Sequence, residues 1–192
     1  DIHNYTYSED YLTERGYTYE WLMRIDDLGR SGQFAFGIQD GHTPKYTAGI
    51  YDGDLAIRGP SGEIASLGNP YLNLDAGTWY RYEIGWALDG TLTLTVYDYM
   101  GDDSQIHQIS GQDTELWSGY IGWDCGVALG GDEDVYYDEL SGGKPGDGDL
   151  LLTDGSVLAL SYENEFRTCT LGISAFQTDT YTAYGALVAE AG

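Results

Sequence analysis

Basic residues are scarce in this chain. Its 192 residues include 8 lysines and arginines against 32 aspartates and glutamates, which gives a formal net charge of -24, and lysine occurs only at Lys45 and Lys144. Nucleic-acid binding depends on lysines and arginines that displace counterions from phosphates, so a nucleic acid is not expected as a partner. The same charge argues against attachment to anionic membranes.

Cysteines, histidines and long apolar runs are also few. The two cysteines, Cys125 and Cys169, have no Cys-x-x-Cys spacing, and with only three histidines a zinc site is not expected. No apolar run approaches the roughly 20 residues of a membrane-spanning helix, so membrane insertion is not expected. In an extracellular protein the two cysteines predict one disulfide that closes a loop of about 44 residues; two separate buried thiols are the alternative.

The acidic residues are spread along the whole chain, from Asp1 to Glu190, while 42% of residues are hydrophobic and 14% are aromatic. This composition predicts a folded domain and not a disordered acidic tail. A surface of short, hydrated carboxylates tolerates molar salt, where the Debye length falls to about 3 Å. We therefore predict a salt-adapted source and an extracellular, cell-surface or virion-surface location; an acidic, calcium-binding extracellular protein is the alternative.

Apolar residues alternate with polar ones wherever the chain is hydrophobic, as in half-buried strands. The clearest alternating runs are 17–25, 34–38, 80–86 and 92–96. Asp52-Gly53 and Asp89-Gly90 each separate two such runs, and Asp-Gly is a strong signal for a tight hairpin. The pattern predicts an all-β fold, a two-sheet antiparallel β-sandwich.

The composition changes after Leu140. We predict a β-sandwich over residues 1–141, a linker rich in glycine and aspartate over 142–149, and C-terminal strands over 150–192. The strands expected in this last part are 157–162, 169–175 and 181–188. About 40 residues are too few for a separate core, so these strands are expected to pack on the sandwich or on a neighbouring chain.

Several segments of residues 17–141 resemble a known family. They are Tyr19-Glu20-Trp21-Leu22-Met23-Arg24-Ile25-Asp26, Phe34-Ala35-Phe36-Gly37-Ile38-Gln39-Asp40, Leu74-Asp75-Ala76-Gly77-Thr78-Trp79-Tyr80-Arg81-Tyr82-Glu83-Ile84-Gly85-Trp86, Asp89-Gly90-Thr91-Leu92-Thr93-Leu94-Thr95-Val96-Tyr97-Asp98 and Val135-Tyr136-Tyr137-Asp138-Glu139-Leu140. In this order they resemble the laminin-G-like, concanavalin-A-like jelly rolls of secreted haloarchaeal proteins. The resemblance implies the jelly-roll fold and says little about the ligand.

The family's opening strands are hard to recognise before Tyr17, whereas residues 147–150 and 155–160 resemble them. We hypothesise that the C-terminal strands take the place of these opening strands, either within one chain or by strand exchange between chains of a homo-oligomer.

Catalysis is not expected. Glycoside hydrolases of this fold carry a Glu-x-Asp-x-Glu signature, because alternate residues of one strand place two carboxylates on one face. No such triplet occurs here, and the nearest patterns are Glu163-Asn164-Glu165 and Asp132-Glu133-Asp134. Gln105-Ile106-His107 resembles a motif of alginate-lyase-like jelly rolls, but that family's arginine-rich stretch is absent.

Binding is the function that the sequence favours. A sugar site on a β-sandwich needs aromatic rings for the apolar sugar face and polar groups for the hydroxyls. The candidate ligand-binding residues are Tyr46, Tyr51, Arg58, Tyr71, Trp117 and Tyr120.

Calcium is the expected cofactor, if there is one, because carboxylates gather in turns. The candidate calcium ligands are Asp102, Asp103, Asp132 and Asp134, with Asp52, Asp54 and Glu133 as further members of such clusters. Asn4-Tyr5-Thr6 is a possible N-glycosylation site.

We therefore expect a non-catalytic module that binds carbohydrate or mediates adhesion, with glycans or another protein surface as partners. The alternatives are a structural protein of a virus particle or surface filament, and a polysaccharide-degrading enzyme.

Overall fold

The computed structural model describes residues 2–41, 43–68, 71–127, 135–142, 158–163 and 168–173. For residues 2–11, 126–127, 158–163 and 168–173 it describes the backbone alone. The strands are β1 (Ile2–Glu14), β2 (Tyr17–Ile25), β3 (Ser31–Ile38), β4 (Tyr46–Tyr51), β5 (Asp54–Gly59), β6 (Gly62–Leu67), β7 (Trp79–Trp86), β8 (Thr91–Tyr97), β9 (Gln105–Gln112), β10 (Ser118–Val127), β11 (Val135–Gly142), β12 (Leu158–Glu163) and β13 (Thr168–Ile173). No helix long and apolar enough to cross a membrane occurs in these ranges.

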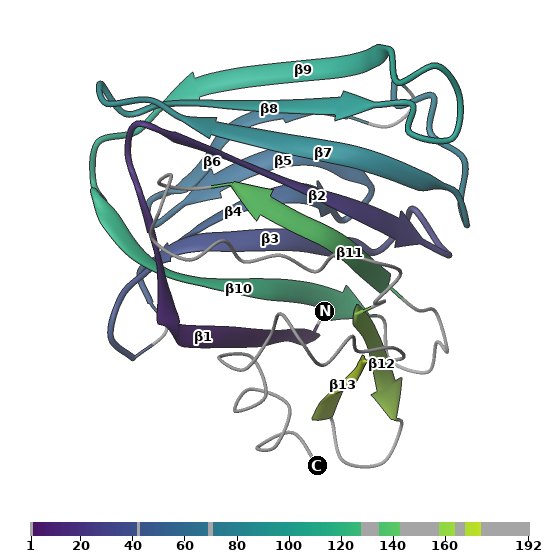
Figure 1. Ribbon diagram of the computed structural model, residues 1–192, viewed down its shortest axis with the longest axis horizontal. Coiled ribbons are helices and arrows are strands. Elements are labelled where there is room, and N and C mark those ends of the chain that lie inside the picture. Colours follow the sequence, from purple (N-terminus) through teal and green to yellow (C-terminus); the bar gives the residue numbers. More distant parts are fainter. Residues whose placement is uncertain are drawn as a thin grey trace, which may run out of the picture.

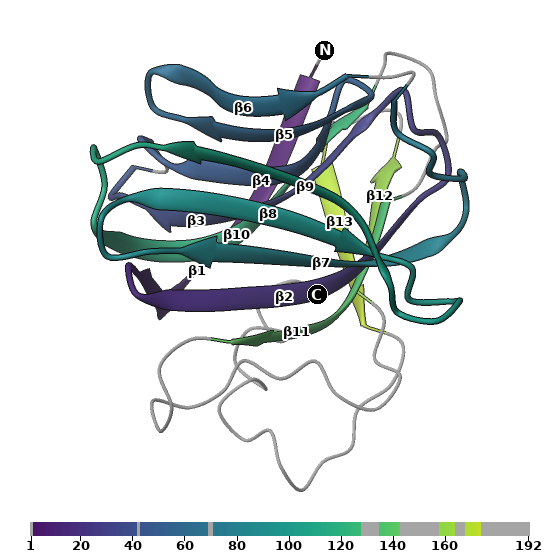
Figure 2. The same ribbon diagram turned by 90° about the horizontal axis from the view of Figure 1, so that it is seen from above.

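The strands form two antiparallel sheets that lie face to face (Figures 1 and 2). One sheet has six strands in the order β1-β10-β3-β4-β5-β6, and the other has seven in the order β13-β12-β11-β2-β7-β8-β9. The prediction of an all-β, two-sheet antiparallel sandwich is confirmed.

Both Asp-Gly pairs form the hairpins that the sequence predicts. Asp52 and Gly53 have φ angles of 48° and 89°, and they connect β4 to β5 with Tyr51 paired to Asp54. Positive φ at both central residues matches the right-handed twist of the two strands, and it is the reason for glycine in such a turn. Gly90, with φ of 86°, lies in the longer turn between β7 and β8.

Aromatic side chains from both sheets fill the core. Trp21 of β2 stacks on Tyr82 of β7 at 5.6 Å between ring centroids and meets Phe34 of the opposite sheet at 5.0 Å. All three side chains are at most 1% exposed. Aromatic pairs of this kind contribute about 0.5–1.5 kcal/mol beyond the burial of their area, so they hold the two sheets in a fixed relation.

Strand β1 was not expected from the sequence, in which the family's opening strands are hard to recognise before Tyr17. It lies at the edge of the six-stranded sheet and pairs with β10 from Ile2↔Val127 to Glu14↔Ser118, with an irregularity between Ser8 and Leu12. The first 14 residues are mostly polar, so hydrophobic alternation does not reveal the strand.

The seven-stranded sheet continues beyond β11 into the C-terminal part of the chain. β12 pairs with β11 through Val135↔Leu160, Tyr136↔Ala159 and Tyr137↔Leu158, and β13 pairs with β12. β11 ends at Gly142. The predicted linker from residue 143 on and the predicted strand 181–188 lie outside the described residues, so the division of the chain at 142–149 stays a prediction.

Candidate functional site

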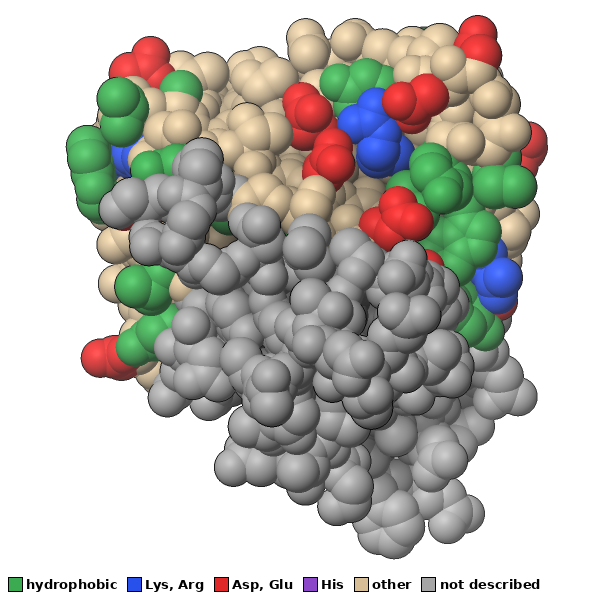
Figure 3. Space-filling model, in the orientation of Figure 1, with side chains coloured by type: hydrophobic (Ala, Val, Ile, Leu, Met, Phe, Trp, Pro, Cys, Tyr) green, Lys and Arg blue, Asp and Glu red, His purple; other side chains and the backbone are tan. Residues whose placement is uncertain are grey.

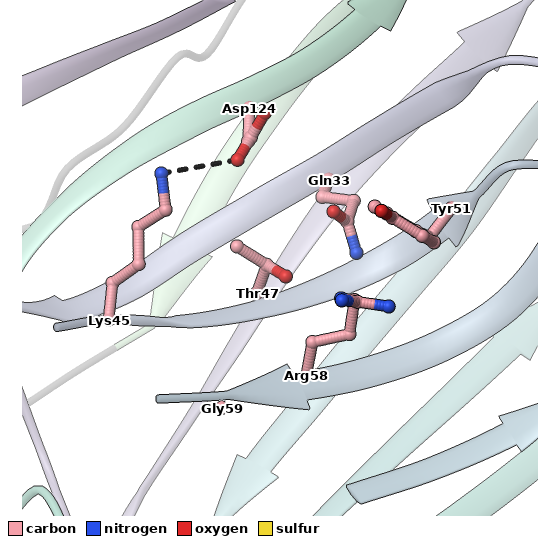
Figure 4. A pocket seen from close by; sticks show the side chains of 7 residues that line it. All are labelled: Gln33, Lys45, Thr47, Tyr51, Arg58, Gly59 and Asp124. Carbon is pink, nitrogen blue, oxygen red and sulfur yellow. Dashed lines mark ion pairs between the residues drawn. The ribbon is translucent and has the colours of Figure 1, made fainter. Parts of the chain in front are cut away.

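A pocket of about 200 Å³ lies on the six-stranded sheet, and it is lined by Gln33, Lys45, Thr47, Tyr51, Arg58, Gly59 and Asp124. These residues come from β3, β5, β10 and the β4 segment with its preceding residue (Figure 4). Alternation explains why polar side chains gather here. On β3, Phe34 and Phe36 face the core, so Gln33 lies on the opposite side of the sheet.

Small residues lie in the register beside Gln33. The register pairs Gln33 with Gly49 and Gly49 with Ala56, so two positions beside Gln33 carry almost no side chain. Gly49 has φ of 144°, and a Cβ atom there would lie 2.4 Å from the carbonyl oxygen of Gly32. The sheet is therefore too tight at this point for any larger residue.

Gln33 supplies an unused hydrogen-bond donor inside this pocket. The residue is 1% exposed, and its Nε2 atom has no hydrogen-bond partner. Leaving a buried polar group unpaired costs about 1–3 kcal/mol, so such groups are rare in folded proteins unless a ligand or water completes them.

Arg58 and Tyr51 form one wall. The guanidinium carbon of Arg58 lies 3.9 Å from the centroid of the Tyr51 ring, which is a close cation-π contact. Arg58 pairs with Thr47, four residues before Tyr51 on the neighbouring strand, and the same-face row between them holds Gly49 and Ala56. The small side chains of that row leave room for Arg58 to reach Tyr51.

Lys45 and Asp124 form the opposite wall. Nζ of Lys45 lies 3.2 Å from Oδ2 of Asp124, and this ion pair crosses over β3 (Figure 4). The side chains are 17% and 8% exposed, so the pair is largely shielded from solvent. Shielded pairs are screened less by salt than exposed ones, so this wall keeps its geometry at high ionic strength.

Of the residues predicted to bind a ligand, Tyr51 and Arg58 line the pocket. Tyr46 does not, because its side chain points into the core and is fully buried. Its hydroxyl donates to Oδ1 of Asp113 at 2.6 Å and accepts from the amide of Leu116 at 3.1 Å. Burial, with the nearby Asp113 carboxylate, raises the pKa of Tyr46 to about 12. The prediction that Tyr46 contacts a ligand is corrected, because it is a structural residue that ties β4 to the loop before β10.

Tyr71, Trp117 and Tyr120 lie away from the pocket. Tyr71 is 70% exposed in the connection between β6 and β7, and Tyr120 lies near the start of β10. Trp117 is 58% exposed, and the guanidinium carbon of Arg15 lies 4.8 Å from the centroid of its ring. These rings do not converge with Tyr51 on one site.

The predicted calcium ligands that the structure describes have other partners. Asp103 binds Arg81 through both carboxylate oxygens, at 3.0 and 2.8 Å. Asp102 accepts a hydrogen bond from the amide of Ser104, and the hydrogen bonds from Ser104 lower its pKa. Among the residues that are described, no group of three histidine, cysteine or carboxylate side chains could hold a metal ion. Asp132, Glu133 and Asp134 lie outside these residues, so calcium there stays a prediction.

Three other predicted features fall wholly or partly outside the described side chains. Cys125 is buried in β10, but the side chain of Cys169 in β13 is not described, so the disulfide stays a prediction. The same holds for glycosylation at Asn4, whose backbone lies in β1. Glu163 ends β12 and Glu165 lies beyond it, so this pair of carboxylates is not placed either.

No protein-family model matches the sequence, and no curated protein matches it. The fold is similar to that of a protein of unknown function with a galectin-like fold from Bacillus subtilis, with a TM-score of 0.53 and 10% identity over 73% of this chain and 76% of that chain. It is also similar to a functionally unknown protein from Saccharomyces cerevisiae, with a TM-score of 0.50 and 16% identity over 70% and 72% of the two chains. At these identities the likeness shows the fold alone. The likeness to a galectin-like fold agrees with the predicted two-sheet jelly-roll sandwich.

The prediction that the chain is not an enzyme is corrected. A β-1,3-glucanase from Mycobacterium marinum is among the solved structures with a similar fold, with a TM-score of 0.43 and 15% identity over 65% of this chain and 57% of that chain. Enzymes are thus among the structural matches, and the exclusion of catalysis that we drew from the missing Glu-x-Asp-x-Glu triplet is withdrawn.

Proposed function

We propose that the chain binds carbohydrate in the pocket of the six-stranded sheet. The observation that carries this proposal is the unpartnered, buried Nε2 of Gln33, which points into a pocket whose other walls are polar (Figure 4). A sugar hydroxyl or ring oxygen that accepts from Gln33 would satisfy this group.

The rest of the lining suits a sugar. The Thr47 hydroxyl and the Arg58 guanidinium can bond to hydroxyls, and the Tyr51 ring offers an aromatic surface at the rim. Ligand sites are commonly concave, with a few polar groups that fix orientation.

Replacing Gln33 by methionine tests the proposal, because methionine has a similar length and no polar atoms. We expect Gln33→Met to lower the affinity for the bound oligosaccharide by about tenfold or more. This is the change expected when at least one well-placed hydrogen bond is lost. The free protein should keep its stability or gain some, since an unpaired buried amide is removed. An oligosaccharide array at about 0.15 M and about 2 M KCl identifies the ligand, and titration calorimetry measures the affinity.

Gln39→Met is the matched control. Nε2 of Gln39 donates to the carbonyl oxygens of Gly37 and Ser118, at 2.9 and 2.6 Å, and Gln39 does not line the pocket. This variant should lose stability and keep its affinity. The proposal would be contradicted if the unaltered protein bound no oligosaccharide, or if Gln33→Met bound with unchanged affinity. Mass spectrometry of the recovered oligosaccharides shows in the same experiment whether they are cleaved.

We further propose that this binding takes place outside the cell, as an adhesion or glycan-recognition module. The acidic composition and the resemblance to secreted laminin-G-like modules support this part of the proposal.

A further inference from the structure

We propose that the pocket selects an acidic sugar, one that carries a carboxylate or a sulfate group, and that Arg58 binds this group. The inference rests on the proposed function, since it names the class of sugar that the same pocket takes.

Arg58 stands out among the basic residues. Those with described side chains are Arg15, Arg24, Arg30, Lys45, Arg58 and Arg81. Arg24, Arg30, Lys45 and Arg81 each pair with a carboxylate within 3.3 Å. In the part of the chain that the structure describes, Arg58 makes no ion pair and no side-chain hydrogen bond, and its guanidinium lies over the Tyr51 ring. Arg15 also lacks a carboxylate partner, but its Nε donates to the carbonyl oxygen of Leu116 at 2.9 Å. Arg58 is therefore the one of these six residues whose side chain has neither an ion pair nor a hydrogen bond.

A carboxylate is available beside Arg58 but is not used. Glu63 of β6 is the register partner of Arg58, yet its Oε1 accepts from the hydroxyl of Ser66 at 2.8 Å. Arg58 instead extends toward Tyr51 and into the pocket (Figure 4). The strand pairing therefore offers an intramolecular ion pair that the side chains do not form.

The donors in the pocket also lack an acceptor. The Gln33 amide nitrogen and the Arg58 guanidinium point toward the same space, and neither has an acceptor among the described residues (Figure 4). The acidic group at the other wall, Asp124, is already paired with Lys45. With that pair neutral, Arg58 gives the pocket a net positive charge. Two unpaired donors, one of them charged, are the recognition geometry for an oxyanion of a ligand.

The probes form a matched set that varies charge on one sugar backbone. They are oligogalacturonides, their methyl esters, neutral galacto-oligosaccharides and sulfated galacto-oligosaccharides, with an equivalent glucose-based set. The affinities are measured by calorimetry at about 2 M KCl. This salt screens the long-range repulsion between the acidic protein and an acidic ligand, while the contact inside the pocket is screened less. We expect at least one carboxylated or sulfated probe to bind about tenfold or more tightly than its uncharged counterpart. The preferred probe tells whether the group is a carboxylate or a sulfate.

Arg58→Gln should remove this preference and leave the affinity for the uncharged counterpart within about twofold. Arg58→Lys should retain part of the preference, because it keeps the charge and loses the planar fork. Arg24→Gln is the control, since it changes net charge equally on the other sheet, where Arg24 pairs with Asp26. It should keep the full preference.

The outcomes separate this inference from the proposed function. Equal binding of charged and uncharged probes, abolished by Gln33→Met, would overturn the acidic-sugar class and leave carbohydrate binding intact. A preference for charge that survives in Arg58→Gln would overturn the role of Arg58. No binding of any probe or array sugar would overturn both.

Discussion

At the scale of single residues, Asp138 is a charged group in an unfavourable place. It lies in β11, is 9% exposed, and accepts a hydrogen bond from the amide of Glu139 at 2.8 Å. Burial raises its pKa above the ordinary value of 3.8. The folded state therefore holds the Asp138 proton more tightly than the unfolded chain does. As a result, Asp138 lowers the free energy of unfolding as pH rises from 3.8 through the raised folded pKa.

We predict that Asp138→Asn is more stable than the unaltered protein at neutral pH, because the asparagine oxygen keeps the hydrogen bond and no charge is buried. The difference should close below pH 3.8, where the aspartate is protonated in both states. Urea denaturation across this pH range measures it.

Asp102→Asn serves as the control with the opposite sign. Hydrogen bonds from Ser104 lower the pKa of Asp102, so its charged form favours folding above the ordinary value, and that contribution is lost as pH falls. This variant should be no more stable than the unaltered protein at neutral pH. A less stable Asp138→Asn at neutral pH would show that the carboxylate has a favourable partner in the folded state.

The sequence identified only part of the candidate site. Tyr51 and Arg58 were predicted, because a sugar site needs aromatic rings for the apolar sugar face and polar groups for the hydroxyls. Gln33 and Asp124 were missed, since they lie on β3 and β10, which are far apart in sequence and adjacent only in the folded sheet. One signal was available: Gln33 is a polar residue on the non-core side of a strand whose other residues there are small.

At the scale of strands, Gly49 fixes how closely β3 and β4 approach. A Cβ atom at this residue would lie 2.4 Å from Gly32 O and 3.0 Å from Gln33 Cα, both backbone atoms. We predict that Gly49→Ala destabilises the protein by more than about 3 kcal/mol, because strain at positive φ adds to a backbone clash within a sheet. Urea denaturation followed by tryptophan fluorescence measures the loss.

Gly62→Ala separates the two causes. Gly62 has φ of 124°, but nothing lies within 4 Å of the position of its Cβ. It should cost only the conformational strain, about 1–2 kcal/mol. Similar losses in the two variants would mean that the strands separate easily at Gly49.

Strand pairing was predictable where it is local. The two Asp-Gly hairpins follow from turn chemistry, and the core side of β2 and β7 follows from alternation. The pairing of β1 with β10 joins residues more than 100 positions apart, and that of β11 with β2 is similarly distant. Such contacts depend on which sheet edges meet in the folded molecule, and no short pattern in the sequence records them.

At the scale of the whole molecule, the excess of acidic residues opposes folding. The formal charge is -24, and Figure 3 shows acidic side chains scattered over the outer side of the seven-stranded sheet. Several of the basic residues are already paired, such as Arg81 with Glu20 and Asp103. Repulsion among the remaining carboxylates is long-range and is therefore screened by salt.

We predict that the Tm rises by several degrees or more between about 0.05 M and about 2 M KCl, as screening removes this repulsion. Differential scanning calorimetry measures the shift. Sucrose at matched osmolality is the control, because it stabilises proteins without screening charge. A Tm that is unchanged by KCl, or that rises equally in sucrose, would contradict an electrostatic origin and weaken the prediction of a salt-adapted source.

The pocket and the core share their strands, one side each. Gln33 faces the proposed ligand, while its neighbour Phe34 packs against Trp21, so a single layer of backbone separates sugar from hydrophobic interior. The lining residues lie in strands or directly beside one, so the site cannot separate from the sheet without disturbing the strands themselves. Occupancy and folding are consequently one coupled equilibrium, in which every bound molecule withdraws protein from the unfolded pool in proportion to its concentration.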